Sequence, residues 1–138
     1  MKPKILVVDD DPDVLRLLQL TLERDGFKPA LAGDGETALR RIEAERFDLV
    51  LLDVMMPVMD GWQVLQVVNA MSNPPKVIVV SAKAHPADRA RAFSLGAAEY
   101  VTKPFPLDAL VGIIETVLGR SQEELQRLSN RETVAPPP

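Results

Sequence analysis

Hydrophobic and polar positions form two kinds of segment along this chain. Short, uninterrupted apolar runs alternate with longer stretches in which apolar residues recur every three or four positions. The runs are typical of strands buried on both faces, and the longer spacing is typical of amphipathic helices. The pattern predicts five strands, at residues 5–8, 27–32, 49–53, 77–80 and 99–102. A helix is expected after each strand, with inner faces that include Leu18, Ala38, Leu65, Phe93 and Ile114.

The alternation of strands and helices predicts an α/β fold with a doubly wound parallel sheet and right-handed crossovers. Pro29 cannot donate to a strand ladder, so the strand at residues 27–32 is expected at an edge of the sheet. A flavodoxin-like strand order 2-1-3-4-5 with five flanking helices satisfies this condition. That order places the first and third strands side by side at the topological switch point.

Several polar residues are suited to helix starts. Asp11 before Pro12 is a predicted N-cap, and Asp60 followed by Gln63 is typical of a capping box. His85 is the only histidine in the chain and comes directly before Pro86. A cap or surface role is therefore favoured for His85 over a role in relaying phosphate.

Chemically active side chains follow the predicted strands at the point where each one ends. These residues are Asp9, Asp10, Asp53, Ser81 and Lys103. Because the carboxyl ends of parallel strands lie at one edge, the five are expected on one rim. Three neighbouring carboxylates repel one another unless a cation lies among them, and an all-oxygen set with few protein ligands favours Mg²⁺ over Ca²⁺.

This set of side chains is suited to phosphoryl transfer. Asp53 would attack the phosphorus atom, while Mg²⁺, Lys103 and Ser81 neutralise the equatorial oxygens. Aspartates at strand ends are also common as turn formers and helix caps, and that structural role is the alternative for each residue taken singly.

Four motifs resemble those of the receiver domains of two-component response regulators. They are Ile5–Asp10, Leu51–Pro57 with Asp60 and Gly61, Ser81 with Ala82, and Tyr100–Phe105. The resemblance covers about residues 4–118 with the expected order and spacing. It implies a domain that takes a phosphoryl group on Asp53 from a sensor histidine kinase, a phosphotransfer protein or a small phosphodonor.

The resemblance also implies roles for individual residues. Asp9, Asp10, Asp53 and the backbone carbonyl of Met55 would hold Mg²⁺, while Ser81 and Lys103 would bind the phosphoryl group. Tyr100 would turn inward when Ser81 is drawn towards the phosphate. These residues are read from the positions of the family's motifs in this chain.

Further expectations come from the family. Met55 and Lys83 would flank the path of the hydrolytic water and so set the phosphate lifetime, and a cis peptide is expected between Lys103 and Pro104. Phosphorylation would change the face made by the fourth helix, fifth strand and fifth helix, where an unknown protein partner binds. A monomer or a weak phosphorylation-dependent homodimer is expected, since Ala98 and Gly112 replace charges usual in the dimerising subfamily.

Two other functions compete with this interpretation. A Mg²⁺-dependent phosphohydrolase of the aspartyl-phosphate type would carry a second aspartate as general acid, at the position of Met55. An interaction module that never takes phosphate would usually lack part of the acidic cluster or the lysine, and this chain has both. A domain that is not an enzyme beyond its own phosphorylation and slow dephosphorylation is therefore favoured.

Composition limits the remaining classes. The 138 residues are 46% hydrophobic, which is enough for one packed domain, and contain no cysteine for disulfides or thiolate metal sites. The net charge of -4 and the pI near 5.0 argue against direct nucleic-acid binding. No run resembles a signal peptide or membrane span, so a cytoplasmic protein is expected.

The end of the chain differs in composition from the rest. We predict a receiver domain over residues 1–119, followed by an extension over residues 120–138. Ser121–Glu124 is a capping-box pattern for a short helix with Leu125 and Leu128 on one face. The proline-rich end, Val134–Pro138, is expected to be disordered. No output domain fits in this segment, so the chain works alone or is a piece of a longer protein.

Overall fold

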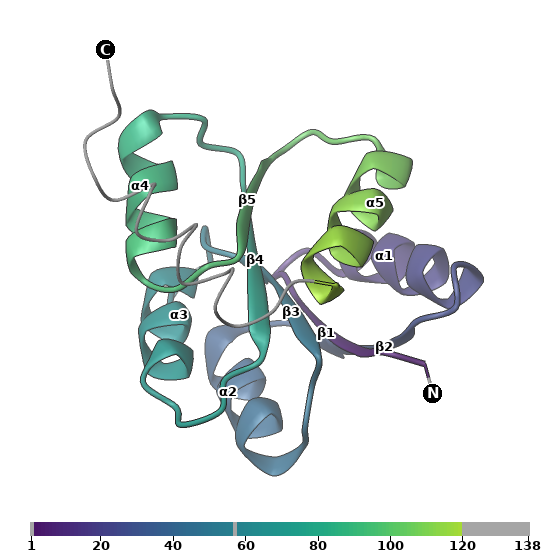
Figure 1. The fold of residues 1–138 in the computed structure, drawn as a ribbon, viewed down its shortest axis with the longest axis horizontal. Helices are drawn as coiled ribbons and strands as arrows, with labels where there is room; N and C mark the ends of the chain where they lie inside the picture. Colours follow the sequence, from purple (N-terminus) through teal and green to yellow (C-terminus); the bar gives the residue numbers. More distant parts are fainter. Residues whose placement is uncertain (1, 57, 120–138) are drawn as a thin grey trace.

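The computed structural model describes residues 2–56 and 58–119 and has the predicted α/β fold (Figure 1). The strands are β1 (Lys4–Val8), β2 (Lys28–Ala32), β3 (Leu49–Asp53), β4 (Lys76–Ser81) and β5 (Glu99–Thr102). The helices are α1 (Pro12–Arg24), α2 (Gly35–Ala44), α3 (Gly61–Asn69), α4 (Pro86–Ser94) and α5 (Leu107–Leu118). None of the helices in these ranges is both long and apolar enough to cross a membrane.

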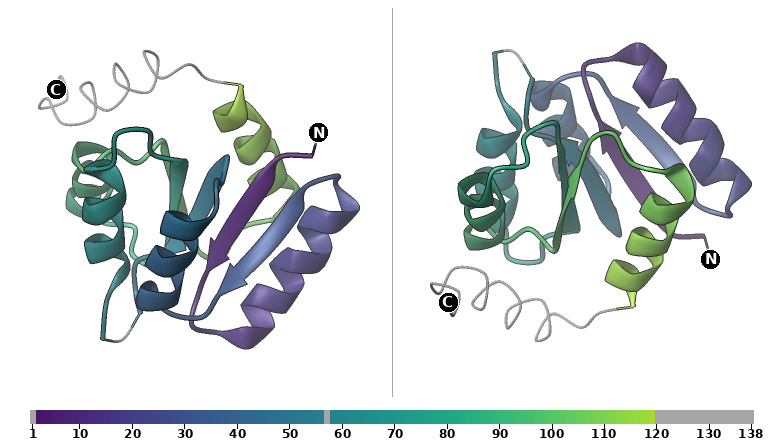
Figure 2. Two further views of the ribbon diagram at one scale, coloured as in Figure 1. Left: turned by 90° about the horizontal axis from the view of Figure 1, so that it is seen from below. Right: turned by 90° about the horizontal axis from the view of Figure 1, so that it is seen from above.

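The sheet is parallel throughout, in the order β2-β1-β3-β4-β5, which confirms the flavodoxin-like prediction. Pro29 lies in β2, at the edge where its missing N–H does not interrupt a central ladder. Figures 1 and 2 show α2, α3 and α4 on one face of the sheet and α1 and α5 on the other. The fold therefore has three layers, with the sheet in the middle.

The central strand β3 is buried on both faces, as its apolar run predicts. Val50 and Leu52 belong to the apolar cluster shared with α2, α3 and α4. Leu49 and Leu51 belong to the cluster shared with α1 and α5. This alternation arises because successive side chains of a strand point to opposite faces. Covering both faces leaves only the ends of the strand open to a ligand.

The predicted helix caps are present. Asp11 accepts a hydrogen bond from the amide of Asp13, and Asp60 with Gln63 forms a complete capping box at α3. His85 caps α4, since its Nδ1 atom accepts a hydrogen bond of 3.0 Å from the amide of Ala87. The cap role favoured for His85 is thus confirmed.

Three strands differ from their predicted bounds by one residue. β1 begins one residue earlier, at Lys4, and β4 extends one residue further at each end, over Lys76–Ser81. β2 instead begins one residue later, at Lys28 and not at Phe27. The amide of Phe27 donates to the carbonyl of Leu22 at 2.9 Å, which closes the end of α1. The amide of Lys28 is the first to bond toward the neighbouring chain segment, at Pro3. The predicted helix after Ser121 and the proline-rich end lie outside the described residues.

Gly61 allows α3 to begin directly against the end of β3. A Cβ atom at Gly61 would lie 2.4 Å from the carbonyl oxygen of Asp53 and 2.4 Å from the Cα atom of Val54. Both are backbone atoms, which cannot move without displacing the end of the strand. The absence of a side chain at Gly61 therefore fixes how closely α3 approaches Asp53.

Replacing Gly61 with alanine should lower the free energy of unfolding by roughly 2 kcal/mol or more, because the added methyl group overpacks a backbone contact. Gly112 is the matched control, since it is helical and nothing lies within 4 Å of its added Cβ. Gly112→Ala should raise stability by about 0.5–1 kcal/mol through helix propensity. Urea denaturation measures the free energy of unfolding of both variants. Equal changes in the two variants would contradict the close backbone contact proposed at Gly61.

Candidate functional site

The structure brings the predicted polar residues to one edge of the sheet. Asp53 is the last residue of β3 and Ser81 the last residue of β4, while Asp9 and Lys103 directly follow β1 and β5. Asp10 is adjacent to Asp9. The strands β1 and β3 pair directly, so the two buried aspartates sit at the switch point of the doubly wound sheet.

The three carboxylates form a compact cluster. One carboxylate oxygen from each of Asp9, Asp10 and Asp53 lies within 4.8 Å of the others. Asp9 and Asp53 are only 3% and 5% exposed, so water screens their mutual repulsion poorly. Asp10 is exposed at the rim. The cluster is therefore open to an ion or a ligand from the side of Asp10.

Lys103 is the cation that faces this cluster. Its Nζ atom lies 2.9 Å from Oδ2 of Asp9 and 3.5 Å from Oδ2 of Asp53. One ammonium group between these carboxylates offsets only part of their charge. The pocket is left with negative charge that favours a bound cation.

Backbone amides hold the other oxygen of each buried carboxylate. The amide of Asp11 donates to Oδ1 of Asp9, and the amide of Met55 donates to Oδ1 of Asp53, both at 2.9 Å. These bonds fix the carboxylates with their Oδ2 atoms towards Lys103. The side chains are thus positioned before any ligand binds.

The surroundings raise the pKa of Asp53 above its ordinary value. Burial is the main cause and the charge of Asp9 adds to it, while the amide of Met55 and the ammonium of Lys103 act in the opposite direction. For Lys103, burial lowers the pKa, but its hydrogen bond to Asp9 and its attraction to both carboxylates outweigh burial and raise the pKa overall. Lys103 accordingly remains a cation in the pocket.

Ser81 and Tyr100 are joined through the backbone of Lys83. The amide of Lys83 donates to Oγ of Ser81 at 3.1 Å, and the carbonyl of Lys83 accepts a hydrogen bond of 2.6 Å from the hydroxyl of Tyr100. Ser81 is fully buried and Tyr100 is 6% exposed, so the tyrosine ring already lies inward. The sequence identified Lys83 only through its side chain, whereas this link uses backbone atoms that any residue supplies.

The cluster suits a hard divalent cation. All of its candidate ligands are oxygens, the geometry leaves one side open for water, and neither histidine nor cysteine takes part. This donor set fits Mg²⁺, which receiver domains generally bind through acidic residues. The structure does not test the predicted part of the Met55 carbonyl, which stays a prediction.

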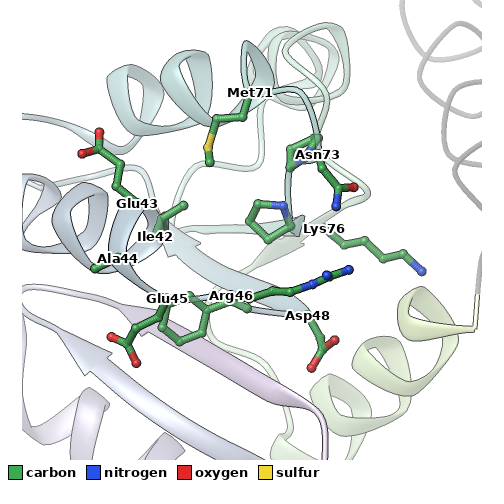
Figure 3. Close-up of a pocket in the computed structure, with 12 residues that line it drawn as sticks. Ile42, Glu43, Ala44, Glu45, Arg46, Asp48, Met71, Asn73 and Lys76 are labelled. Carbon is green, nitrogen blue, oxygen red and sulfur yellow. The ribbon is translucent and has the colours of Figure 1, made fainter.

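The surface has one hollow beside this pocket and another at the opposite end of the strands. An apolar hollow of about 460 Å³ adjoins Lys103 and is lined by Val14, Leu17, Leu18, Ala82, Lys103, Pro104, Phe105 and Leu107. A more polar hollow of about 450 Å³ lies at the other end of the strands, with Arg46, Asp48 and Lys76 among the residues around it (Figure 3). None of the predicted site residues lines the second hollow.

The peptide bond between Lys103 and Pro104 is cis, as the family resemblance predicted. Phe105 follows it and lines the apolar hollow. In the sequence, Phe105 stands out only as the end of the motif Tyr100–Phe105, and nothing there gives Leu17 a part in the site. Only the folded chain places both residues around the hollow beside Lys103.

Known proteins resemble this chain in sequence and in structure. A sequence model of the response regulator receiver domain matches residues 5–115. The transcriptional regulatory protein PrrA of Mycobacterium tuberculosis is 41% identical over 134 residues, which is 97% of this chain and 58% of PrrA. The alkaline phosphatase synthesis transcriptional regulatory protein PhoP of Bacillus subtilis is 38% identical, over 88% of this chain and 51% of PhoP.

Solved structures give the same result. The chemotaxis protein CheY4 of Vibrio cholerae has a TM-score of 0.81 at 28% identity, covering 85% of this chain and 99% of CheY4. A CheY-like receiver domain protein from Methanospirillum hungatei has a TM-score of 0.82 at 28% identity, covering 93% of this chain and 99% of its own.

The fold and the acidic pocket at its switch point define a flavodoxin-like signalling domain of the CheY type. The chain belongs to the response regulator receiver domain family. It spans between half and three-fifths of the length of the curated relatives described above, at 58% of PrrA and 51% of PhoP.

Charge on Asp53 should cost stability when no cation is present. Because the folded pKa of Asp53 is raised, its contribution to stability is full below the ordinary value of 3.8 and is lost as pH rises through the folded pKa. At pH 7 in EDTA, the free energy of unfolding of Asp53→Asn should therefore exceed that of the wild type by on the order of 1 kcal/mol. Thermal melts of both proteins between pH 4 and pH 7 check this prediction. The difference in stability between Asp53→Asn and the wild type should become smaller towards pH 4.

Magnesium provides the control for this comparison. A cation that binds the folded carboxylates stabilises the wild type by mass action, so added Mg²⁺ should narrow or reverse the advantage of Asp53→Asn. A variant that is less stable than the wild type at pH 7 in EDTA would contradict the destabilising role of the buried charge.

Proposed function

We propose that this domain is a phosphoacceptor switch in which Asp53 takes a phosphoryl group in a Mg²⁺-dependent reaction. The observation that carries the proposal is the juxtaposition of Asp53 with Asp9, Asp10 and Lys103 at the switch point of the sheet. A buried carboxylate among acidic neighbours and one ammonium group has no evident structural use. The same arrangement is suited to transferring and holding a phosphoryl group.

The transfer step follows from these groups. A carboxylate oxygen of Asp53 attacks the phosphorus atom of a phosphohistidine, and an acyl phosphate forms on Asp53. The phosphorus–nitrogen bond breaks and its electron pair stays on the imidazole nitrogen. The other ring nitrogen of the phosphohistidine carries a proton, so the group that leaves is a neutral imidazole. The ammonium of Lys103 and the hydroxyl of Ser81 stabilise the oxygens of the phosphoryl group as charge spreads.

Asp9, Asp10, Asp53 and the carbonyl of Met55 would hold Mg²⁺ in this reaction. The bound ion supplies positive charge that offsets the negative charge of the carboxylates and the phosphoryl group. Asp9 also fixes Lys103 through their 2.9 Å contact. The same aspartate therefore positions both sources of positive charge.

The phosphodonor is expected to be a sensor histidine kinase or a phosphotransfer protein, and a small phosphodonor is sufficient for the chemistry. A protein donor would rest on the apolar hollow beside Lys103, where Leu17 is 50% exposed and Phe105 forms part of the wall. Lys103 lines this hollow and also contacts the carboxylates of Asp9 and Asp53. A helix bound there would bring its phosphohistidine to Asp53.

Ser81, Lys83 and Tyr100 offer a route from phosphorylation to the output face. A phosphoryl group that draws the hydroxyl of Ser81 would shift the backbone of Lys83, whose carbonyl accepts the hydrogen bond that already holds Tyr100 inward. The affected face comprises α4, β5 and α5. We propose that an unknown protein partner, or weakly a second copy of the chain, binds this face.

The proposed domain is a cytoplasmic signalling protein without direct contact to nucleic acid, and its receiver portion covers residues 1–119. Its only reactions are its own phosphorylation and slow loss of phosphate. An interaction module that takes no phosphate, and a phosphohydrolase that turns phosphodonor over, are the alternatives that the following experiment separates.

Incubation with acetyl phosphate and Mg²⁺ should add one phosphoryl group to the protein, as measured by intact mass. The adduct should be absent in Asp53→Asn and in EDTA, because one variant lacks the acceptor and the other condition lacks the cation. Asp60→Asn is a matched control, since Asp60 caps α3, lies outside the cluster of three carboxylates, and is replaced by a residue that can accept the same capping hydrogen bond. Rapid release of phosphate without an adduct would instead support the phosphohydrolase, and no reaction in the folded protein would support the interaction module.

Phosphate on Asp53 should be long-lived. Met55 is 48% exposed and its side chain cannot orient a water molecule by hydrogen bonding, and the ammonium of Lys83 can only donate. The double variant Met55→Asn, Lys83→Glu supplies groups that can orient the attacking water. The lifetime of its phosphoryl group should therefore be shorter than that of the wild type by a factor of up to about ten. The decay of the adduct by intact mass gives the rate, and an unchanged lifetime would contradict the roles assigned to these two positions.

A further inference from the structure

Few apolar contacts hold α4 in place. Ala92 and Phe93 are its only buried residues, whereas α3 buries Gly61 and four apolar side chains. Burial of apolar surface is the main force that docks a helix on a sheet. The position of α4 therefore depends more on the contacts of its charged side chains than the position of α3 does.

Two arginines of α4 contact aromatic rings in different ways. The guanidinium of Arg89 lies 5.1 Å from the ring of Phe93 in the same helix and 3.7 Å from Glu99 of β5. The guanidinium of Arg91 lies 4.3 Å from the ring of Trp62 in α3. Figures 1 and 2 both show α3 and α4 side by side. Arg91 thus joins α4 to α3, and Arg89 joins α4 to β5.

Trp62 is fixed to the strand that carries Asp53. It is the second residue of α3 and follows Gly61, whose amide donates to the carbonyl of Val54 at 3.3 Å. Because Gly61 leaves no room against Asp53 and Val54, the first turn of α3 cannot move independently of the end of β3. Trp62 is 7% exposed and packs in the same apolar cluster as Val54.

We propose that Arg91 and Trp62 form a latch that holds α4 in the position seen here and opens when phosphorylation of Asp53 moves α4. The inference rests on the proposed function. It adds a second connection between Asp53 and α4, which runs through Gly61 and Trp62 and does not involve Ser81 or Tyr100. The latch sets how readily the domain switches.

The size of the effect follows from the kind of contact. An arginine over the face of a tryptophan ring, with its guanidinium open to solvent, stabilises the contact enough to shift a two-state equilibrium about two- to five-fold. Loss of the latch should raise the fraction of the switched conformation by this factor when that fraction is small. The rate of phosphorylation by acetyl phosphate should rise in proportion, because the competent conformation is more populated.

Acrylamide quenching of Trp62 tests the latch, since Trp62 is the only tryptophan in the chain. In the wild type, quenching should be weak and should increase on phosphorylation with acetyl phosphate and Mg²⁺, because departure of Arg91 uncovers the ring. In Arg91→Ala, quenching should be strong from the start and change little. This variant should also be phosphorylated about two- to five-fold faster.

Two variants separate the latch from other effects. Arg89→Ala removes an arginine from the same helix that stacks on Phe93 and not on Trp62, so it should keep the wild-type quenching response. Arg91→Met keeps a long side chain over the ring without the charge. It should quench weakly like the wild type but be phosphorylated at a rate close to that of Arg91→Ala.

Intact mass measured on each sample distinguishes two failures. A complete phosphoryl adduct with unchanged quenching in the wild type would overturn the latch and leave the proposed function in place. The same holds if Arg91→Ala matches Arg89→Ala in quenching and rate. Absence of an adduct at Asp53 would overturn the proposed function and the latch together.

Discussion

Repulsion among the carboxylates at the end of β1 and β3 is the interaction on which the rest of this structure depends. Asp9 and Asp53 are almost fully buried, where like charges interact more strongly than in water. Lys103 offsets part of this charge, and burial still raises the pKa of Asp53. The ionised form of Asp53 is therefore disfavoured in the fold when no metal ion is bound. The same negative charge makes the pocket receptive to a metal cation.

The remainder of the fold supplies the stability that this pocket removes. Leu49–Leu52 are buried on both faces of the sheet, and burial of apolar area contributes roughly 25 cal/mol per Å². The parallel arrangement that permits this burial also brings the carboxyl ends of all five strands to one edge. The same constraint therefore produces both the core and the site. Gly61 completes the arrangement by letting α3 start against Asp53 without a side chain between them.

The parts of the structure set by periodicity could be predicted from the sequence. Pro29 was sufficient to place β2 at an edge, and the strand order then brought Asp9, Asp53 and Lys103 together. Contacts that depend on how two helices pack could not be predicted, because the spacing within one helix says nothing of its neighbour. The stack of Arg91 on Trp62 is of this kind.

Contacts made by backbone atoms also could not be predicted from the sequence. The carbonyl and amide of Lys83 link Tyr100 to Ser81, and neither group depends on the identity of the residue. A similar limit explains the start of β2, where the amide of Phe27 closes the preceding helix although its side chain fits a strand pattern.

The energies of the contacts in the proposed switch show which of them can drive the conformational change. Moving a two-state equilibrium from 1:99 to 99:1 needs about 5.5 kcal/mol of differential binding. The contact of Arg91 with Trp62 contributes only about 0.5–1 kcal/mol, so it can adjust the set point and cannot drive the change. The larger share must come from new charged hydrogen bonds between a phosphoryl group and the residues around Asp53, each worth about 1.5–3 kcal/mol. The latch is therefore weak enough for phosphorylation to open and strong enough for a single substitution in α4 to change how easily it opens.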